Sequence, residues 1–134
     1  MIVQIIGSWC PNCMDETRFM AQLYREYHQK GLEIIALCYE SADYESSVKA
    51  MKRFKEGTGA PYTFLYAGEA SKRKAALTLP MLNRIVSYPT AIFIDRHGEV
   101  RKIFTGFSGP GTGEYYRQLT EEIRKLVHMM TREK

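Results

Sequence analysis

The feature that most constrains this chain is a pair of cysteines, Cys10 and Cys13, separated by two residues. The pair follows the apolar and mostly β-branched segment from Ile2 to Ile6, which predicts a short buried strand ended by Gly7. Pro11 fits the first position of a helix, where a missing N–H costs no hydrogen bond. A gap of two residues within the first helical turn brings both sulfurs close enough to bond. The motif therefore predicts a redox-active dithiol between a strand and a helix.

The position of this motif at a helix start predicts two unequal thiols. Free N–H groups and the helix dipole favour negative charge there, so Cys10 is expected to be the acidified, attacking thiolate. Cys13 lies one turn deeper and is expected to be the less exposed, resolving sulfur. Asp15 and Glu16 bring negative charge to the same first turn and oppose the acidification. We therefore expect only a moderate lowering of the pKa of Cys10.

The rest of the sequence alternates between helical and strand patterns. Phe19, Leu23 and Tyr27 repeat every four residues and give the first helix one apolar stripe, which Gly31 ends. After this helix we expect a strand at 32–38, a helix at 43–56, a strand at 62–66, a short helix at 68–79, a strand at 90–95, a hairpin into a strand at 99–105, a glycine-rich loop at 106–113 and a helix at 114–130. Such an order combines parallel βαβ units with one antiparallel hairpin. It predicts an α/β fold, a three-layer α/β/α sandwich with a mixed central β-sheet.

Composition sets the remaining bounds. With 134 residues, 45% of them hydrophobic and 25% charged, the chain suits a single globular domain, expected to span residues 1–134. The net charge of +4 is scattered and does not support nucleic-acid binding, and the basic residues 71–74 are interpreted as a solvated helix face. No apolar run reaches the roughly 20 residues that a membrane-spanning helix needs. Because the first strand begins almost at the first residue, we expect a domain cut from a longer precursor.

A cysteine pair with this spacing is also half of a structural zinc site. Such sites usually have four ligands, and the sequence has neither a second pair of this kind nor a cysteine close to a histidine. His28, His97 and His128 are isolated, so no metal ligands are predicted. The third cysteine, Cys38, ends an apolar run. It is interpreted as a packed core thiol, with a third redox partner as the alternative.

The segment Gly7–Cys13, with the sequence GSWCPNC, and the Tyr-Pro-Thr at 88–90 together resemble the thioredoxin superfamily. More narrowly, the chain is similar to the TlpA/ResA-type thiol–disulfide oxidoreductases. The resemblance also includes Glu16 and the segments 94–98 and 104–106, and it spans nearly the whole chain. Either motif alone would be a weaker signal than the two together.

This resemblance implies a thioredoxin-like fold in which Pro89 is cis and faces the dithiol, since proline is the residue that adopts a cis peptide bond at low cost. The alternative is an ordinary trans proline at a strand entrance. The resemblance also implies that Tyr88, just before the proline, offers its backbone to an incoming substrate strand. Trp9 is expected to shield the site and to offer an apolar platform. Together with Tyr88, Pro89 and Pro11, it makes up the expected substrate-binding residues.

Two positions concern the proton of the resolving cysteine. Thioredoxin has a buried acid six residues before its first cysteine, where this chain has Gln4, which cannot take a proton. ResA-like proteins instead carry a glutamate in a Glu-Ser context after the second strand, and Glu40 stands before Ser41 at that place. At the carboxyl end of a strand, Glu40 is expected to be a catalytic proton acceptor for Cys13. A solvated loop carboxylate is the alternative.

The sequence therefore predicts a thiol–disulfide oxidoreductase whose redox group is the Cys10–Cys13 disulfide, with no further cofactor. The expected partners are disulfide- or dithiol-containing proteins and an upstream thiol electron donor, not nucleic acid. By resemblance, the direction is more often reductive and the location is the periplasm or cell envelope, with membrane association only through an N-terminal anchor outside this sequence. The rival interpretation is a thioredoxin-fold binding module or Cu(I) metallochaperone that holds the ion between the two thiolates. Related copper carriers add a histidine near the dithiol, and His97 in its hairpin turn is badly placed for that role.

Overall fold

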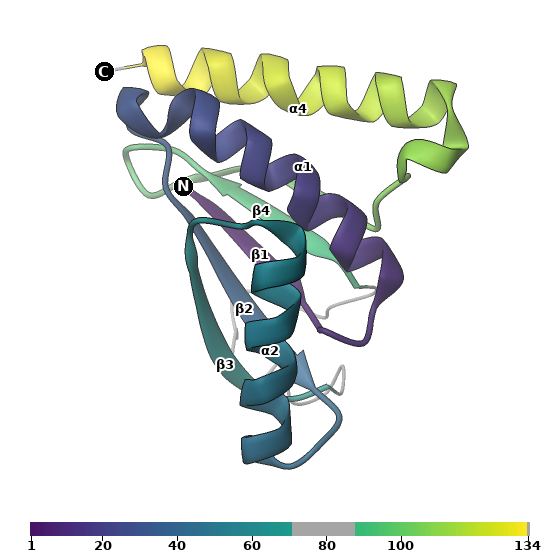
Figure 1. Cartoon of the computed structure of the whole chain (residues 1–134). Helices are drawn as coiled ribbons and strands as arrows, with labels where there is room; N and C mark the ends of the chain where they lie inside the picture. The colour runs from purple at the N-terminus through teal and green to yellow at the C-terminus, as the bar shows by residue number, and fades with distance from the viewer. Residues whose placement is uncertain (71–87, 134) are drawn as a thin grey trace.

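A mixed sheet of five strands forms the centre of the computed structural model, which describes residues 1–70 and 88–133 (Figure 1). The strands are β1 (Ile2–Ile6), β2 (Ile34–Glu40), β3 (Thr63–Glu69), β4 (Thr90–Ile94) and β5 (Val100–Thr105), in the spatial order β3-β2-β1-β4-β5. β1, β2 and β3 are parallel, whereas β4 is antiparallel to both β1 and β5. The predicted mixed sheet is confirmed, and β1 is its central strand.

Helices in the described part of the chain are α1 (Pro11–Tyr27), α2 (Tyr44–Thr58) and α4 (Glu114–Arg132), with short 3-10 helices η1 (His28–Lys30) and η2 (Pro110–Thr112). Gly31 follows η1 in the left-handed conformation, with φ of 105°, and ends the helix where the sequence predicts. Asp43 caps α2, because its side chain accepts a hydrogen bond from the backbone N–H of Ser46 at 2.9 Å. Within residues 1–70 and 88–133, none of the helices has the length and apolar character needed to cross a bilayer.

The region after β2 differs from the sequence-based expectation. β3 extends to Glu69 because its pairing with β2 continues as far as Glu40 opposite Glu69. A helix therefore does not begin at residue 68, and that part of the prediction is wrong. The remainder of the predicted helix, including the basic residues 71–74, lies outside the described residues. The three-layer prediction also places helices on both faces of the sheet. The helix predicted at 68–79 is part of that expectation and lies mostly outside the described residues.

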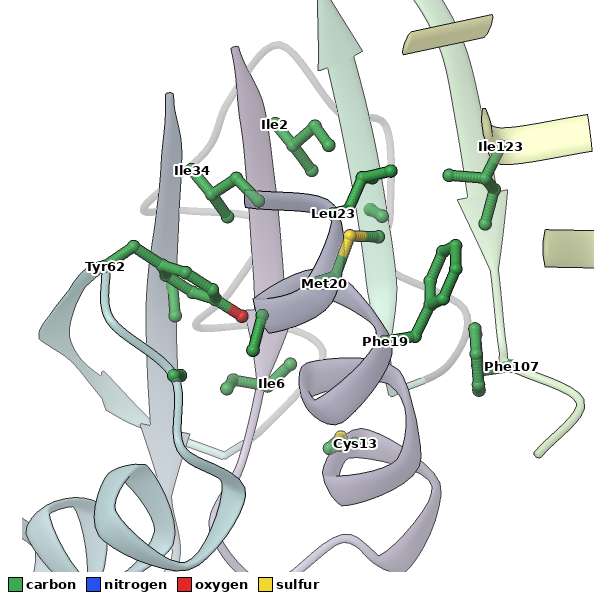
Figure 2. Packing of buried hydrophobic residues seen from close by; sticks show 14 of the residues in the cluster. Ile2, Ile6, Cys13, Phe19, Met20, Leu23, Ile34, Tyr62, Phe107 and Ile123 are labelled. Carbon is green, nitrogen blue, oxygen red and sulfur yellow. The ribbon is translucent and has the colours of Figure 1, made fainter. Parts of the chain in front are cut away.

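The helices α1, α2 and α4 pack on one face of the sheet, and α1 contacts both of the others. Side chains alternate along β1, and Figure 2 shows Ile2 and Ile6 on the side of the sheet that α1 covers. Gln4 shares this side, because its side chain donates a hydrogen bond to Glu16 of α1. A second group of buried residues, which includes Ile5 and Ile92, occupies the opposite face. The central strand is thus buried on both faces, as its apolar sequence predicts, and Gln4 is the polar exception on the helix-facing side.

A test of this core uses Phe93, which is fully buried, with its ring centroid 5.2 Å from that of Phe104. Phe93→Ala is expected to lower the free energy of unfolding by about 3–5 kcal/mol, because it removes buried contacts and leaves a cavity. Tyr115→Ala is the matched control. Tyr115 is 72% exposed, and its loss is expected to change the stability by less than about 0.5 kcal/mol. Equal destabilisation of the two variants in urea denaturation would contradict this packing.

Candidate active site

Cys10 forms the start of α1 as its N-cap residue. Its backbone is extended, with φ of −100° and ψ of 114°, and its Sγ accepts a hydrogen bond from the backbone N–H of Cys13 at 3.2 Å. Sulfur therefore takes the place that a serine or aspartate oxygen usually has at a helix N-terminus. Pro11 follows at the first helical position, as the sequence predicts. Both cysteines are free thiols, with Cys10 only 6% exposed and Cys13 fully buried.

The two thiols differ strongly in acidity. A hydrogen bond from the Cys13 thiol lowers the pKa of Cys10 to about 7, assisted by the backbone N–H groups of Cys13 and Asn12 and opposed by burial. The same hydrogen bond, together with burial, raises the pKa of Cys13. Near neutral pH, Cys10 thus loses its proton readily, whereas Cys13 keeps its proton. This agrees with the unequal thiols and the moderate acidification that the sequence predicts.

The acidic residues of α1 lie further along the helix than the sequence analysis placed them. The first turn of α1 carries no acidic residue, because the helix begins at Pro11 and Asp15 and Glu16 belong to its second turn. Asp15 lies on the helix surface, where its carboxylate is 3.9 Å from the guanidinium of Arg18. Glu16 points inwards and is 1% exposed. The expectation of two first-turn charges was therefore wrong.

Trp9 and Tyr88 form an aromatic wall beside the dithiol. The indole Nε1 of Trp9 donates a hydrogen bond to the carbonyl oxygen of Tyr39 at 2.9 Å, and its ring meets the ring of Tyr88 edge to face, with centroids 5.1 Å apart. Trp9 remains 47% exposed. The peptide bond between Tyr88 and Pro89 is cis, and the carbonyl oxygen of Tyr88 lies 3.8 Å from Sγ of Cys10. The structure thus brings Trp9, Cys10, Tyr88 and Pro89 together.

Gly7 permits this arrangement. A Cβ atom at this position would lie 2.2 Å from Nε1 of Trp9 and 2.8 Å from the carbonyl oxygen of Tyr39. Both distances are far below van der Waals contact, so any side chain here would displace the indole from its hydrogen bond. In the sequence, Gly7 is recognisable only as the end of a strand. The structure adds that it is the site of a close approach between the β1–α1 loop and Trp9.

Glu40 ends β2 and is 2% exposed, so its interpretation as a solvated loop carboxylate is wrong. The backbone N–H of Ser8 donates to its Oε2 at 2.8 Å, and the Ser8 hydroxyl donates to its Oε1. These contacts tie the loop that carries Trp9 and Cys10 to the end of β2. Acceptance of the Cys13 proton by Glu40 stays a prediction.

Sequence reasoning missed a buried polar group behind Cys13. Glu16 accepts a hydrogen bond at 2.8 Å from Nε2 of Gln4, whose Oε1 accepts one at 2.5 Å from the hydroxyl of Tyr62. Burial raises the pKa of Glu16 to about 8, opposed by the Gln4 hydrogen bond and increased by the charge of Cys10. The available signal was spacing, since Glu16 follows Cys13 by three residues and shares its helix face.

The remaining candidates lie outside this constellation. Cys38 is 1% exposed and burial raises its pKa to about 12, which suits the predicted core thiol. His97 is exposed in the β4–β5 turn, where its backbone N–H donates to Asp95. Across residues 1–70 and 88–133, no group of three or more histidine, cysteine, aspartate or glutamate side chains could hold a metal ion.

The fold and this dithiol at a helix N-cap, beside a cis proline, define a thioredoxin-like protein. The sequence model of the Redoxin family matches residues 1–119. The chain is 30% identical over 121 residues to "Thiol-disulfide oxidoreductase ResA" of Halalkalibacterium halodurans, covering 90% of this chain and 58% of that protein. It is 31% identical over 123 residues to the protein of the same name from Bacillus thuringiensis subsp. konkukian, covering 90% of this chain and 60% of that protein.

A crystal structure of a thiol:disulfide interchange protein of the thioredoxin family from Chlorobium tepidum has a similar fold. Its TM-score is 0.69 at 18% identity, and the alignment covers 97% of this chain and 78% of the other. This chain belongs to the Redoxin family and is a TlpA/ResA-type member of the thioredoxin superfamily. It spans about three-fifths of the length of the curated relatives it matches.

The acidity of Cys10 gives a direct test of the site. Alkylation of Cys10 by iodoacetamide is expected to rise with pH and to level off above a midpoint near pH 7, because the thiolate is the reactive form. Cys13→Ala removes the hydrogen bond that lowers this pKa most, so the midpoint is expected to move up by about one pH unit. Peptide mass spectrometry measures modification at Cys10. Cys38→Ala is the control and should leave the midpoint in place; an unmoved midpoint in Cys13→Ala contradicts the proposed geometry.

Proposed function

We propose that this chain is a thiol–disulfide oxidoreductase that reduces disulfides in partner proteins through Cys10 and Cys13. The observation that carries the proposal is the short contact at the start of α1, where Sγ of Cys10 lies 3.2 Å from the backbone nitrogen of Cys13. The Cys10 sulfur that accepts this hydrogen bond is acidified and nearly buried, and the thiol of Cys13, the residue that donates it, keeps its proton. The curated relatives named thiol–disulfide oxidoreductase support the same activity.

The proposed reaction has two exchanges. The Cys10 thiolate attacks one sulfur of the partner disulfide, forms a mixed disulfide and releases the other sulfur as a thiolate, which takes a proton. Cys13 then loses its proton and attacks Sγ of Cys10, the second partner sulfur leaves as a thiolate that takes up a proton, and the Cys10–Cys13 disulfide forms. The partner gains two electrons and two protons, and the two cysteines are oxidised. We propose no cofactor besides this disulfide, and an upstream thiol donor to reduce it again.

The surface around Cys10 suits an extended peptide. Trp9 offers an exposed apolar ring and Pro11 is exposed at the start of α1, so both flank the nearly buried Cys10 sulfur. We propose that the backbone of Tyr88, before the cis bond to Pro89, aligns the substrate strand. Glu40 would hold the β1–α1 loop in place through Ser8, and it remains the sequence-based candidate for the proton acceptor of Cys13.

The proposed reductive direction rests on the acidity of Cys10. Strong oxidants of this superfamily have a stabilised reduced form, with a nucleophile pKa of about 3.5, whereas thioredoxin has a value of about 7. The pKa of about 7 for Cys10 is close to the second case. A dithiol that is only moderately stabilised gives up its electrons more readily.

By resemblance to its family, we also propose that residues 1–134 form one domain of a cell-envelope protein whose membrane association would come from an N-terminal anchor.

Insulin reduction tests the activity. With dithiothreitol as the electron source, the protein is expected to accelerate insulin precipitation, and Cys10→Ser is expected to lower the rate to the uncatalysed level because it removes the attacking thiolate. Cys38→Ala is the control, expected to keep at least about half of the rate because Cys38 is packed in the core. Activity that survives in Cys10→Ser contradicts the proposal. Tight Cu(I) binding by mass spectrometry without turnover would favour the metallochaperone instead.

A second measurement tests the direction. Equilibration of the Cys10–Cys13 pair against glutathione is expected to give a reduction potential of about −270 mV, near that of thioredoxin. The reason is the moderate stabilisation of the Cys10 thiolate. Quantification of reduced and oxidised protein by thiol labelling and mass spectrometry provides the readout. A potential of about −120 mV, as in a strong oxidant, would overturn the reductive assignment but leave disulfide exchange itself intact.

A further inference from the structure

A cavity of about 280 Å³, which we call the β5–α4 pocket, lies between the end of β5, the last strand in the order of the described sheet, and the first half of α4. Two buried rings line it, those of Phe104 and Phe107, which are 9% and 7% exposed. Leu119 and Tyr115 of α4 line its other side, and Tyr115 is 72% exposed. The pocket is smaller than the roughly 300–1,000 Å³ of most small-molecule sites. Its size and aromatic lining suit a side chain of another polypeptide.

The β5–α4 pocket begins next to the cis proline of the dithiol site. Gly106, which lines the pocket, donates its backbone N–H to the carbonyl oxygen of Pro89 at 2.7 Å. Pro89 follows Tyr88, whose carbonyl oxygen lies 3.8 Å from Sγ of Cys10. Two short contacts therefore lead from the reactive sulfur to the wall of the pocket, and the two sites form one continuous surface.

The separation of the pocket from the sulfur fits an extended peptide. Cys10 follows β1, and only β4 lies between β1 and β5 in the sheet. Neighbouring strands lie about 4.8 Å apart, so two spacings give about 10 Å, which is the length of about three residues of extended chain. A polypeptide whose cysteine reacts with Cys10 can therefore place a side chain about three residues away in the β5–α4 pocket.

The loop between β5 and α4 is held against the helix that carries the dithiol. The ring of Phe107 packs on that of Phe19 of α1, with centroids 6.2 Å apart (Figure 2), and meets the ring of Tyr116 edge to face at 6.1 Å. Gly109 lies directly against Asp15 of α1, because a Cβ atom at this position would overlap the carboxylate. The pocket is thus formed before any occupant arrives, which lowers the entropic cost of binding.

The charges around the β5–α4 pocket favour an uncharged occupant. Glu122 is the charged residue that lines it, and Nζ of Lys102 on β5 lies 3.2 Å from its carboxylate. The same ammonium group lies 5.4 Å from the centre of the Phe104 ring. Because this ion pair is already balanced, a carboxylate or ammonium group of an occupant would lose hydration in the pocket without gaining a partner. A neutral apolar side chain has no such cost.

We propose that the β5–α4 pocket binds a neutral aromatic or large aliphatic side chain of the partner protein, located about three residues from the cysteine that Cys10 attacks. The proposal rests on the proposed function and names its substrate class, which is proteins with such a side chain near the reactive disulfide. Burial of this side chain stabilises the complex in which Cys10 attacks, so it raises the second-order rate constant of the exchange. The pocket contributes binding, and the sulfur chemistry stays with the dithiol.

Peptide disulfides measure this preference. Each short peptide carries one cysteine in a glycine–serine chain, joined in a disulfide to 5-thio-2-nitrobenzoate. Attack of Cys10 on the peptide sulfur breaks this S–S bond, forms the mixed disulfide and releases the coloured thiolate, whose absorbance reports the rate. Phenylalanine, alanine or aspartate is placed in turn at each position within about four residues of the cysteine. At about three residues on one side, phenylalanine is expected to raise the rate constant at least about fivefold over alanine, and aspartate is expected to give no increase.

Variants of α4 test whether the preference arises in the β5–α4 pocket. Tyr115→Ala removes an exposed part of its lining, and Leu119→Asp places a charge within it. Both are expected to lower the ratio of the phenylalanine rate to the alanine rate to less than about twofold. Met129→Ala is the matched control. Met129 is 46% exposed on the same helix and outside the pocket, so this variant should keep the full ratio.

A structural measurement locates the bound side chain. Cys13→Ser has no resolving thiol, so the mixed disulfide between the peptide and Cys10 accumulates. In NMR spectra of this adduct, the phenylalanine peptide is expected to shift the backbone amide signals of Gly106, Ser108 and Gln118, which line the pocket. The alanine peptide should leave these signals close to their positions in the free protein.

The outcomes separate the pocket from the chemistry. Equal rates for the three residues at every position, or a preference that survives in both Tyr115→Ala and Leu119→Asp, overturn the assignment of the β5–α4 pocket. A dimer of the parent in sedimentation that Leu119→Asp separates would give the pocket to a second copy of the chain and overturn it as well. A parent protein that releases no coloured thiolate from any peptide instead refutes the proposed function.

Discussion

The hydrogen bond between the Cys13 backbone N–H and Sγ of Cys10 is the contact on which the site depends. A helix N-terminus needs acceptors for its free N–H groups, and here a sulfur is one of them. Because the best such acceptor is negatively charged, the start of α1 stabilises the thiolate by the same interaction that stabilises the helix. The Cys13 thiol, in the first turn, adds a second hydrogen bond to the same sulfur. The same hydrogen bonds therefore cap α1 and stabilise the Cys10 thiolate.

The elements around α1 keep this helix start in place. Ser8 is tied to Glu40 at the end of β2, and Trp9 is tied to the carbonyl oxygen of Tyr39 beside it. Since β1 and β2 are parallel, their carboxyl ends meet at the same edge of the sheet, and both anchors act on the loop between β1 and α1. Gly7 makes the second anchor possible, because it has no side chain where the indole lies. The position of Cys10 therefore depends on β2 as much as on its own helix.

Local patterns predicted most of this fold and the identity of the dithiol. The spacing of Cys10 and Cys13 and the apolar stripe of α1 are properties of neighbouring residues, and they need no knowledge of the tertiary structure. The residues at which strands begin and end depend instead on pairing between neighbouring strands. β2 was predicted at 32–38 but forms at Ile34–Glu40, because its register with β1 begins at Ile2 opposite Ile34 and its register with β3 continues to Glu40. Long-range pairing of this kind is not visible in a single segment.

The buried polar group was missed for a related physical reason. A glutamate three residues after a cysteine is most often solvated, and only the position of α1 on β1 turns Glu16 inwards. In the sequence, Gln4 is notable only because an amide cannot take a proton. In the structure, its Nε2 donates a hydrogen bond to the buried carboxylate of Glu16. Tyr62, which completes the set, lies 58 residues from Gln4 in the sequence, and no local pattern connects the two.

The two buried carboxylates near the dithiol are suited to different tasks because their donors differ. Ser8 donates to both oxygens of Glu40, so this carboxylate anchors the loop between β1 and α1 to the end of β2. Glu16 is held by the amide of Gln4 in a fully buried position that favours its neutral form. Burial and the charge of Cys10 both raise the pKa of this carboxyl group, and its own charge raises the pKa of Cys13, so Glu16 acts on the dithiol through charge rather than through a direct contact with the loop. The donors around each acid, more than its distance along the chain from the cysteines, determine which part of the site it supports: Glu40 holds the loop before Cys10 through Ser8, and Glu16 lies with Gln4 in the core beneath α1.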